Sequence, residues 1–270
     1  MKKLFVPILA LFFIACDQED VDDVKNSANP EASIEAVREY ALVNQIFQDI
    51  GNNTGDAVLT SENSQTSKIS GAKNEPNITI EPFDLTSFPK TITVDFGDGL
   101  LCKDGITRSG VVTIVSSNWY RVEGSVHTTT FDNYYHEDYK VEGTHVSENL
   151  GENADGFLEY GVTINEGKIA TEAGAGIQYK ENSTRTWISG FDTPLNIWDD
   201  EYLLDGKQSG ESSKGVEYTL TIDESLHFVL LPRQVKSGIL SLEVGFFKDI
   251  KLNYGEKTIT VLGVTYPLVD

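Results

Sequence analysis

Short runs of alternating apolar and polar residues fill the chain from residue 89 to residue 270. In one run Tyr218, Leu220 and Ile222 alternate with polar neighbours, which predicts a strand with one buried face and one solvent-exposed face. Gly, Asn and Asp turns separate the runs, as at Asn165-Glu166-Gly167, where a hairpin is expected. Because the gaps between runs are hairpin-sized, the pattern predicts an antiparallel β-meander, closed as a barrel or folded as a sandwich.

One α-helix is expected before the sheet, over residues 30–51, so the predicted class is mainly all-β with one N-terminal helix. Pro30 suits a first helical position and Glu31 favours the positive helix start. Apolar residues then recur at spacings of four and three: Ala36, Tyr40, Val43, Phe47 and Ile50. Gly51 is expected to end the helix. The apolar stripe predicts packing against the sheet, with a partner-binding helix as the alternative.

Residues 52–88 are expected to form a flexible linker between this helix and the β domain at residues 89–270. Their first two thirds are rich in Ser, Asn, Gly, Thr and Lys and contain few apolar side chains. Such a composition is typical of linkers, because it offers little surface to bury.

The N-terminus predicts export. Lys2 and Lys3 precede an apolar run, Leu4–Ile14, that is too short for a permanent membrane span, which indicates a signal peptide over residues 1–15. Ile14-Ala15-Cys16 resembles the lipobox of bacterial lipoproteins. The resemblance implies cleavage before Cys16 and acylation of its thiol, so the expected partner at this end is a membrane.

Residues 16–29 form an expected acidic tether, because they offer too few apolar side chains to fold. Asp17, Gln18, Glu19 and Asp20 follow the cysteine and resemble the surface-export signal of Bacteroidetes lipoproteins. That resemblance implies a location on the outer membrane, facing the cell exterior.

The charge balance excludes one class of partner. The chain carries 42 acidic and 21 basic side chains, for a formal net charge of −21. Such a surface repels the phosphate backbone, so nucleic acid is not an expected partner.

A longer succession of short motifs resembles a family of Bacteroidetes, flavobacterial-type, outer-membrane lipoproteins with an all-β domain. The motifs are Asp95-Phe96-Gly97-Asp98-Gly99, Arg108-Ser109-Gly110, Gly124-Ser125, Thr130-Phe131-Asp132-Asn133-Tyr134-Tyr135, Val141-Glu142-Gly143-Thr144, Arg185-Thr186-Trp187, Gly190, Asp199-Asp200 and Tyr202. The resemblance covers most of residues 36–238 and implies fold and location, but no activity. The chain departs from the family by having Glu137-Asp138 where Asn-Gly is common, and by lacking cysteines near its C-terminal strands.

Metal and cofactor sites are not expected. If Glu137-Asp138 is a two-residue turn, Thr130 faces His145 and His127 points to the opposite side of the sheet, so the two histidines cannot share an ion. Asp95, Asp98 and Asp104 could hold calcium, but they do not match the EF-hand spacing, and turn formation is the alternative.

The chain is not expected to be an enzyme, because the common nucleophile and zinc-protease motifs are missing. Cys102 has no partner within the chain if Cys16 is acylated, and is expected to be a tolerated thiol. The Gly174-Ala175-Gly176 run lacks the third glycine of a dinucleotide site.

Aromatic residues on or beside the strands are the remaining candidates for ligand contact: Trp119, Tyr120, Tyr134, Tyr135, Trp187 and Trp198. Such rings can stack on sugars, or they can fill the core, and Arg185 could form a cation–π pair with Trp187. The expected function is that of a membrane-anchored, non-catalytic interaction or accessory lipoprotein with a protein or glycan partner. The alternative is a glycan- or small-ligand-binding lipoprotein that uses these rings.

Overall fold

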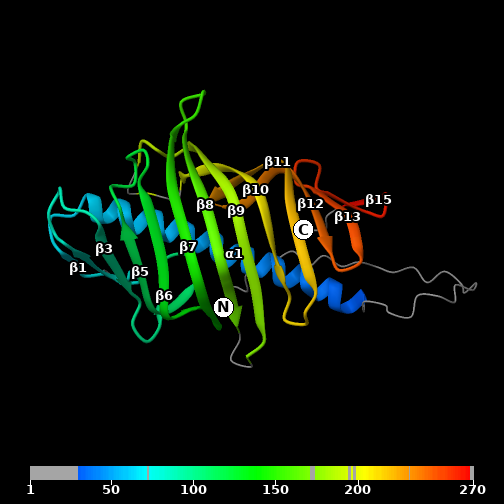
Figure 1. Cartoon of the computed structure of the whole chain (residues 1–270), viewed down its shortest axis with the longest axis horizontal. Coiled ribbons are helices and arrows are strands. Elements are labelled where there is room, and N and C mark those ends of the chain that lie inside the picture. Colours follow the sequence, from blue (N-terminus) through cyan, green and yellow to red (C-terminus); the bar gives the residue numbers. More distant parts are fainter. Residues whose placement is uncertain are drawn as a thin grey trace, which may run out of the picture.

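The computed structural model describes residues 30–71, 73–170, 174–193, 196, 199–230 and 232–267. Within them one long helix, α1 (Pro30–Glu62), lies on one face of a single antiparallel sheet (Figure 1). The strands are β1 (Lys68–Ile69), β2 (Asn77–Glu81), β3 (Lys90–Asp95), β4 (Leu100–Leu101), β5 (Thr107–Ser116), β6 (Val126–His136), β7 (Tyr139–Glu152), β8 (Leu158–Ala170), β9 (Gly176–Ser189), β10 (Glu201–Glu211), β11 (Glu217–Leu230), β12 (Arg233–Val244), β13 (Phe247–Asn253), β14 (Thr258–Val261) and β15 (Val264–Pro267). The expected all-β class with one N-terminal helix is confirmed.

The strands pair in the order in which they occur in the chain, except that β3 and β4 both pair with β5. This order confirms the predicted meander. Within the described ranges the sheet does not close on itself, and β1 and β15 lie at its two ends.

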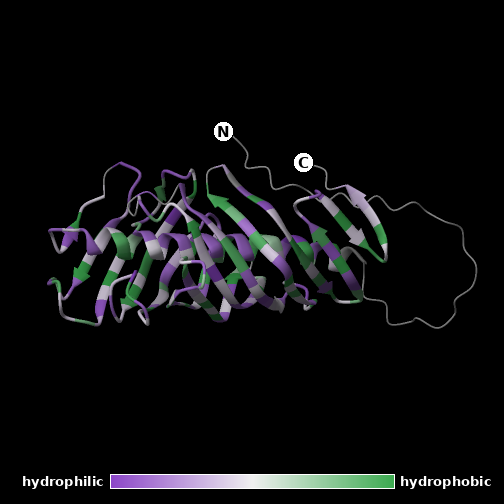
Figure 2. Ribbon diagram, turned by 90° about the horizontal axis from the view of Figure 1, so that it is seen from above, coloured by the Kyte–Doolittle hydropathy of each residue, from purple (hydrophilic) through white to green (hydrophobic). Residues whose placement is uncertain are grey.

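Alternating burial along each strand separates the two faces of the sheet. In β11 the side chains of Tyr218 and Leu220 are buried, whereas Thr219 between them is exposed. Figure 2 shows the same alternation of hydrophobic and hydrophilic residues along many strands. One face of the sheet therefore packs against α1 and the other is polar.

The predicted end of the helix is wrong, because α1 continues from Gly51 to Glu62. Gly51 is buried where the helix packs closely on the sheet: a Cβ atom there would lie 3.2 Å from Nε2 of His145 and 3.3 Å from Nη2 of Arg185. The glycine therefore serves close packing within the helix. Beyond it, Val58 and Leu59 are buried, so tertiary contacts stabilise a segment whose composition resembles a linker.

The expected linker at residues 52–88 also contains β1 and β2, which extend the sheet on its N-terminal side. The β domain thus begins before residue 89. Among the described residues, no helix combines the length and the apolar character needed to cross a bilayer.

The length of α1 matches the width of the sheet that it covers. A helix of 33 residues is about 50 Å long, and strands about 4.8 Å apart place about ten of them under that length. Tyr40 near its start meets Tyr218 of β11, and Thr54 near its end bonds Thr129 of β6. The helix also contacts β2, β3 and β12, so it crosses the strands (Figure 1). Strand β15 lies at the end of the sheet where α1 begins (Figure 1).

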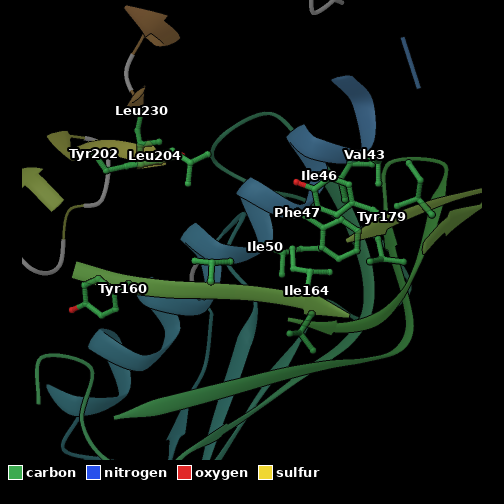
Figure 3. Close-up of a cluster of buried hydrophobic side chains, with 14 of the residues drawn as sticks. Val43, Ile46, Phe47, Ile50, Tyr160, Ile164, Tyr179, Tyr202, Leu204 and Leu230 are labelled. Carbon is green, nitrogen blue, oxygen red and sulfur yellow. The ribbon is translucent and has the colours of Figure 1, made fainter. Parts of the chain in front are cut away.

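The core lies between α1 and the inner face of the sheet (Figure 3). The ring of Phe47 stacks on Tyr179 with a centroid distance of 5.2 Å and an interplanar angle of 10°. Gly167 makes this approach feasible, since a Cβ atom there would lie 3.0 Å from Phe47 and 2.8 Å from Ile164. Val43, Ile46 and Phe47 are at most 1% exposed.

The predicted hairpin at Asn165-Glu166-Gly167 is also wrong, because these residues lie inside the continuous strand β8. Pairing of β8 with β9 shifts between Ile164 and Gly167, and Glu166 has a φ of +56°. The turn-like residues therefore form a β-bulge, which bends the strand without ending it.

Candidate functional site

The aromatic residues singled out in the sequence do not form one exposed platform. Tyr120, Tyr134 and Trp187 are buried, whereas Trp119 and Tyr135 are half-buried. Trp198 lies outside the described residues. Tyr134 packs on Phe96 and Phe131, and Trp119 packs edge-on against Phe88. Core packing explains most of these rings, but Tyr120 and Trp187 face a cavity.

This cavity, of about 40 Å³, lies between the C-terminal half of α1 and strands β8–β11. Apolar and aromatic side chains form its inner wall, and polar side chains form the rest. The lining residues are Gly51, Asn52, Gly55, Asp56, Leu59, Tyr120, Tyr160, Arg185, Trp187, Asp200, Tyr202 and Leu230. Among them Asn52, Asp56, Arg185 and Asp200 are half-exposed and the others are buried, so the cavity opens on the polar side.

The aromatic faces in the cavity wall are already occupied. The ring of Tyr120 stacks on that of Tyr160 with a centroid distance of 4.7 Å. It also contacts the His127 ring in a tilted arrangement, with a centroid distance of 5.1 Å. Tyr202 lies between Phe228, at 5.0 Å, and the Arg185 guanidinium, at 4.1 Å. The cavity is therefore not built for a sugar ring to stack on these tyrosines.

The cation–π pair at Trp187 differs from the one expected. Arg121 lies over the indole at 5.1 Å, while Arg185 lies over Tyr202. Arg185 also donates from Nη1 to Asn52 Oδ1 and from Nη2 to Gln48 Oε1, both at 2.7 Å. These neutral acceptors on α1 hold the guanidinium against the helix without neutralising its charge.

Three buried polar atoms at the cavity lack a hydrogen bond of good geometry: Arg185 Nε, Trp187 Nε1 and Asp200 Oδ1, of which the last two belong to side chains that lie close to each other. An unpaired buried polar group costs about 1–3 kcal/mol, so such atoms are uncommon in a folded protein. Their presence around one cavity indicates a site for a polar group.

Two carboxyl groups at the cavity titrate near neutral pH. Burial raises the pKa of Asp200 to about 7, with the Trp187 indole N–H opposing the shift and the charge of Asp199 adding to it. Burial, together with the negative charge of Glu75, raises the pKa of Asp56 to about 6. Near pH 7 the cavity therefore contains an aspartate that accepts a hydrogen bond in one protonation state and donates one in the other.

The histidine register predicted from the sequence is wrong by one residue. The two-residue turn at Glu137-Asp138 is present, but a bulge between Thr129 and Tyr135 places Thr129, instead of Thr130, opposite His145. His127 and His145 therefore share the inner face, where both are at most 1% exposed. Burial lowers the pKa of His127 to about 4, and burial with the charge of Arg185 lowers that of His145 to about 3, so both are neutral at pH 7.

The Ser–His contacts of the core are closed to solvent. His127 lies between Ser116, with Oγ 2.9 Å from Nδ1, and Ser125, with Oγ 3.2 Å from Nε2. A serine beside a histidine is the usual start of a nucleophilic site. All three side chains are at most 1% exposed, so no substrate reaches them.

The aspartates considered for calcium have separate roles. Asp104 binds the buried Arg108 with both oxygens, and Asp95 accepts a hydrogen bond from the backbone of Gly97 at 2.8 Å. Asp98 is exposed. Within the described ranges, no three His, Cys, Asp or Glu side chains are placed to hold a metal ion.

The thiol of Cys102 is half-buried and free, and burial raises its pKa. A thiol with a raised pKa is a weak nucleophile at neutral pH. Cys16 and the export residues Asp17, Gln18, Glu19 and Asp20 lie outside the described residues, so acylation and export stay predictions.

Sequence reasoning missed Asp56 and Asn52, because it placed both in a linker, and it did not connect Asp200 with Trp187. One signal in the sequence could have linked Arg185 to Trp187: they are two residues apart in a strand, so their side chains lie on the same face.

Comparison with protein-family models, with curated proteins and with solved structures finds no match. The resemblance to Bacteroidetes lipoproteins therefore stays a prediction.

Proposed function

We propose that the protein is a lipid-anchored, non-catalytic interaction protein that adds the free edge of its sheet to an extended strand of a partner protein. The observation that carries the proposal is β15, whose four residues are all exposed and which pairs only with β14 among the described strands. An exposed strand edge offers unpaired backbone groups that another strand can bind.

The side chains around this edge support the proposal. Leu262 is 73% exposed, Val264 is 51% exposed and Tyr266 is 48% exposed. Charged side chains often protect sheet edges from association, and β15 carries none, although Pro267 at its end lacks a backbone N–H and so leaves Thr265 as the residue of β15 that can pair outward. An apolar surface beside free backbone groups suits a partner strand that brings its own apolar side chains.

The register of the last hairpin identifies the backbone group that is free to pair. Leu262 and Gly263 have φ values of +51° and +79° and form a two-residue turn of the primed type. Val261 and Val264 flank the turn and form a hydrogen-bonded pair in such a hairpin, so the backbone N–H and C=O of Thr265 point away from β14. A second copy of the chain is a weaker candidate partner, because two molecules of net charge −21 repel each other.

Photo-crosslinking in native membranes tests the proposed edge. A photoreactive phenylalanine analogue at Leu262 is expected to give one discrete adduct, whereas the same analogue at Leu85, which is also 73% exposed, is expected to give none. Thr265→Pro removes the outward N–H without touching the β14 ladder, and is expected to abolish the adduct.

Adducts of equal yield at both positions, or an adduct that survives Thr265→Pro, would contradict strand addition. An adduct of twice the chain mass would identify a second copy as the partner and overturn the choice of a heterologous one.

The lipid anchor is a separate part of the proposal, and it depends on acylation of Cys16. Cys16→Ala is expected to abolish fractionation with membrane lipids, because a stable anchor needs buried acyl chains. Protease added to intact cells is expected to digest the wild type and to spare a variant in which Asp17, Glu19 and Asp20 are replaced by Ala. A wild type that resists the protease, beside a digested surface control, would place the protein on the periplasmic side.

A further inference from the structure

The cavity between α1 and strands β8–β11 differs from the sheet edge in place and chemistry, and it has a specific set of hydrogen-bonding groups. Trp187 Nε1, Arg185 Nε and Asp200 Oδ1 each lack a hydrogen bond of good geometry, although the Trp187 N–H is close enough to the Asp200 carboxyl group to lower its pKa. The Trp187 side chain is only 7% exposed, so its N–H has no ready access to bulk water. A ligand group that accepts from both donors and donates to the carboxyl group would give all three atoms well-formed hydrogen bonds, and would replace the imperfect contact between Trp187 and Asp200.

The remaining wall of the cavity is apolar. Leu59 of α1 and Leu230 of β11 are buried, and the edges of Tyr160 and Tyr202 complete the surface. Figure 3 shows Tyr160, Tyr202 and Leu230 at the end of the hydrophobic cluster away from Phe47 and Tyr179. A ligand group for this cavity thus needs an apolar end as well as polar atoms.

The charges around the cavity and its volume further restrict the class of ligand that it can bind. Arg185, Asp56 and Asp200 line the cavity and Arg121 lies over Trp187, so groups of both signs are present and a neutral ligand is favoured. The volume of about 40 Å³ is enough for two or three waters or for one small group, since a water needs about 10–15 Å³.

We infer that this cavity binds the acetamido group of an N-acetylated ligand, with an N-acetylated amino sugar as the ligand class. The carbonyl oxygen has two lone pairs and accepts from Trp187 Nε1 and Arg185 Nε. The amide N–H donates to Asp200, and the methyl group packs on Leu59 and Leu230. The sugar ring lies outside, at the mouth formed by Asn52 and Asp56, where its hydroxyl groups meet polar side chains. This inference is independent of the sheet edge and of the membrane anchor.

Calorimetric titration of the full chain tests the inference with a matched set of probes. N-acetyl-D-glucosamine is expected to bind at least about 10-fold more tightly than D-glucosamine or D-glucose, because a site built for hydrogen bonds discriminates against ligands that leave its groups unpaired. Acetamide alone is expected to compete with it. N-acetyl-L-alanine distinguishes an amino sugar from an acetylated amino acid as the source of the acetamido group.

Two conservative variants and one control assign the binding to the cavity. Trp187→Phe removes the indole donor and keeps an aromatic ring, and Asp200→Asn keeps the size of the side chain; each is expected to weaken binding about 5–10-fold, in line with the loss of one hydrogen bond. Trp119→Phe, outside the cavity, is expected to leave binding unchanged. Thermal melting identifies any variant that has not folded.

Equal affinity for the acetylated and the non-acetylated sugars would overturn the inference. So would unchanged binding by both Trp187→Phe and Asp200→Asn. Absence of heat with every probe up to tens of millimolar would mean that the cavity holds water alone. Tighter binding of N-acetyl-L-alanine than of the sugar would retain the acetamido site and overturn the amino-sugar class.

Discussion

Asp104→Ala is expected to lower the free energy of unfolding by about 3–5 kcal/mol, because it leaves a buried cation without its counter-ion. The Arg108 guanidinium is 2% exposed and donates to the Asp104 carboxylate in a bidentate pair, from Nη1 to Oδ1 at 2.9 Å and from Nη2 to Oδ2 at 2.6 Å. Burial alone would lower the pKa of Arg108, but Asp104 outweighs that effect and raises it. The charge nevertheless persists when Asp104 is removed, because a guanidinium stays protonated in proteins even without a partner.

Urea denaturation at pH 7 measures this loss, with Asp98→Ala as the control. Asp98 lies in the same loop region but is exposed, so its removal is expected to change stability by less than about 0.5 kcal/mol. Replacing both members of the pair, as Asp104→Leu with Arg108→Met, is expected to recover much of the loss, since it removes the unpaired charge. If Asp104→Ala costs no more than Asp98→Ala, the guanidinium is solvated and the buried pair is not as described.

Phe47→Ala is expected to cost about 3–5 kcal/mol, the usual range for removing a large buried aromatic side chain. Phe47 is 1% exposed and lies against Tyr179 and Gly167 at the middle of α1. Its ring stacks on the sheet beside the buried Ile46, whereas Gln48 on the other side makes a polar contact, from Nε2 to Glu181 Oε1 at 3.2 Å. The loss therefore weakens the attachment of the helix to the sheet.

Phe246→Ala is the matched control, since the same side chain is 61% exposed there and its removal is expected to cost less than about 1 kcal/mol. Urea denaturation gives both values, and hydrogen exchange shows whether the amides of α1 lose protection first. Equal costs for the two substitutions would be inconsistent with a helix packed on the inner face of the sheet.

The regular part of the fold was predictable because it follows from the local pattern. Period-two alternation gave the strands, and the stripe from Ala36 to Ile50 gave the helix face: Ala36, Val43, Phe47 and Ile50 are all at most 3% exposed. The two main errors arose at residues with a local signal that tertiary structure overrides. Gly51 is a residue type that often ends a helix, but here it allows close packing of the helix on the sheet. Glu166 lies in a turn-like sequence, but here it forms a β-bulge.

The candidate site was less predictable, because its parts come from distant segments. Asp56 and Leu59 lie on α1, Trp187 lies near the end of β9, and Asp200 precedes β10. No short motif contains these residues, and one bulge in the hairpin of β6 and β7 was enough to reverse the expected side of His145. Register errors of one residue exchange the two faces of a strand, so inner-face chemistry depends on details that periodicity does not specify.

The sequential pairing of the strands has a consequence for how the chain folds. From β5 to β15 each strand pairs with the next one along the chain, so most strand contacts have a short sequence separation and the sheet has a low contact order for its size. Because α1 precedes every described strand in the chain, it is available to each hairpin that follows. The sheet can therefore grow from its N-terminal strands towards its C-terminal ones, with the helix as a template and β15 added last.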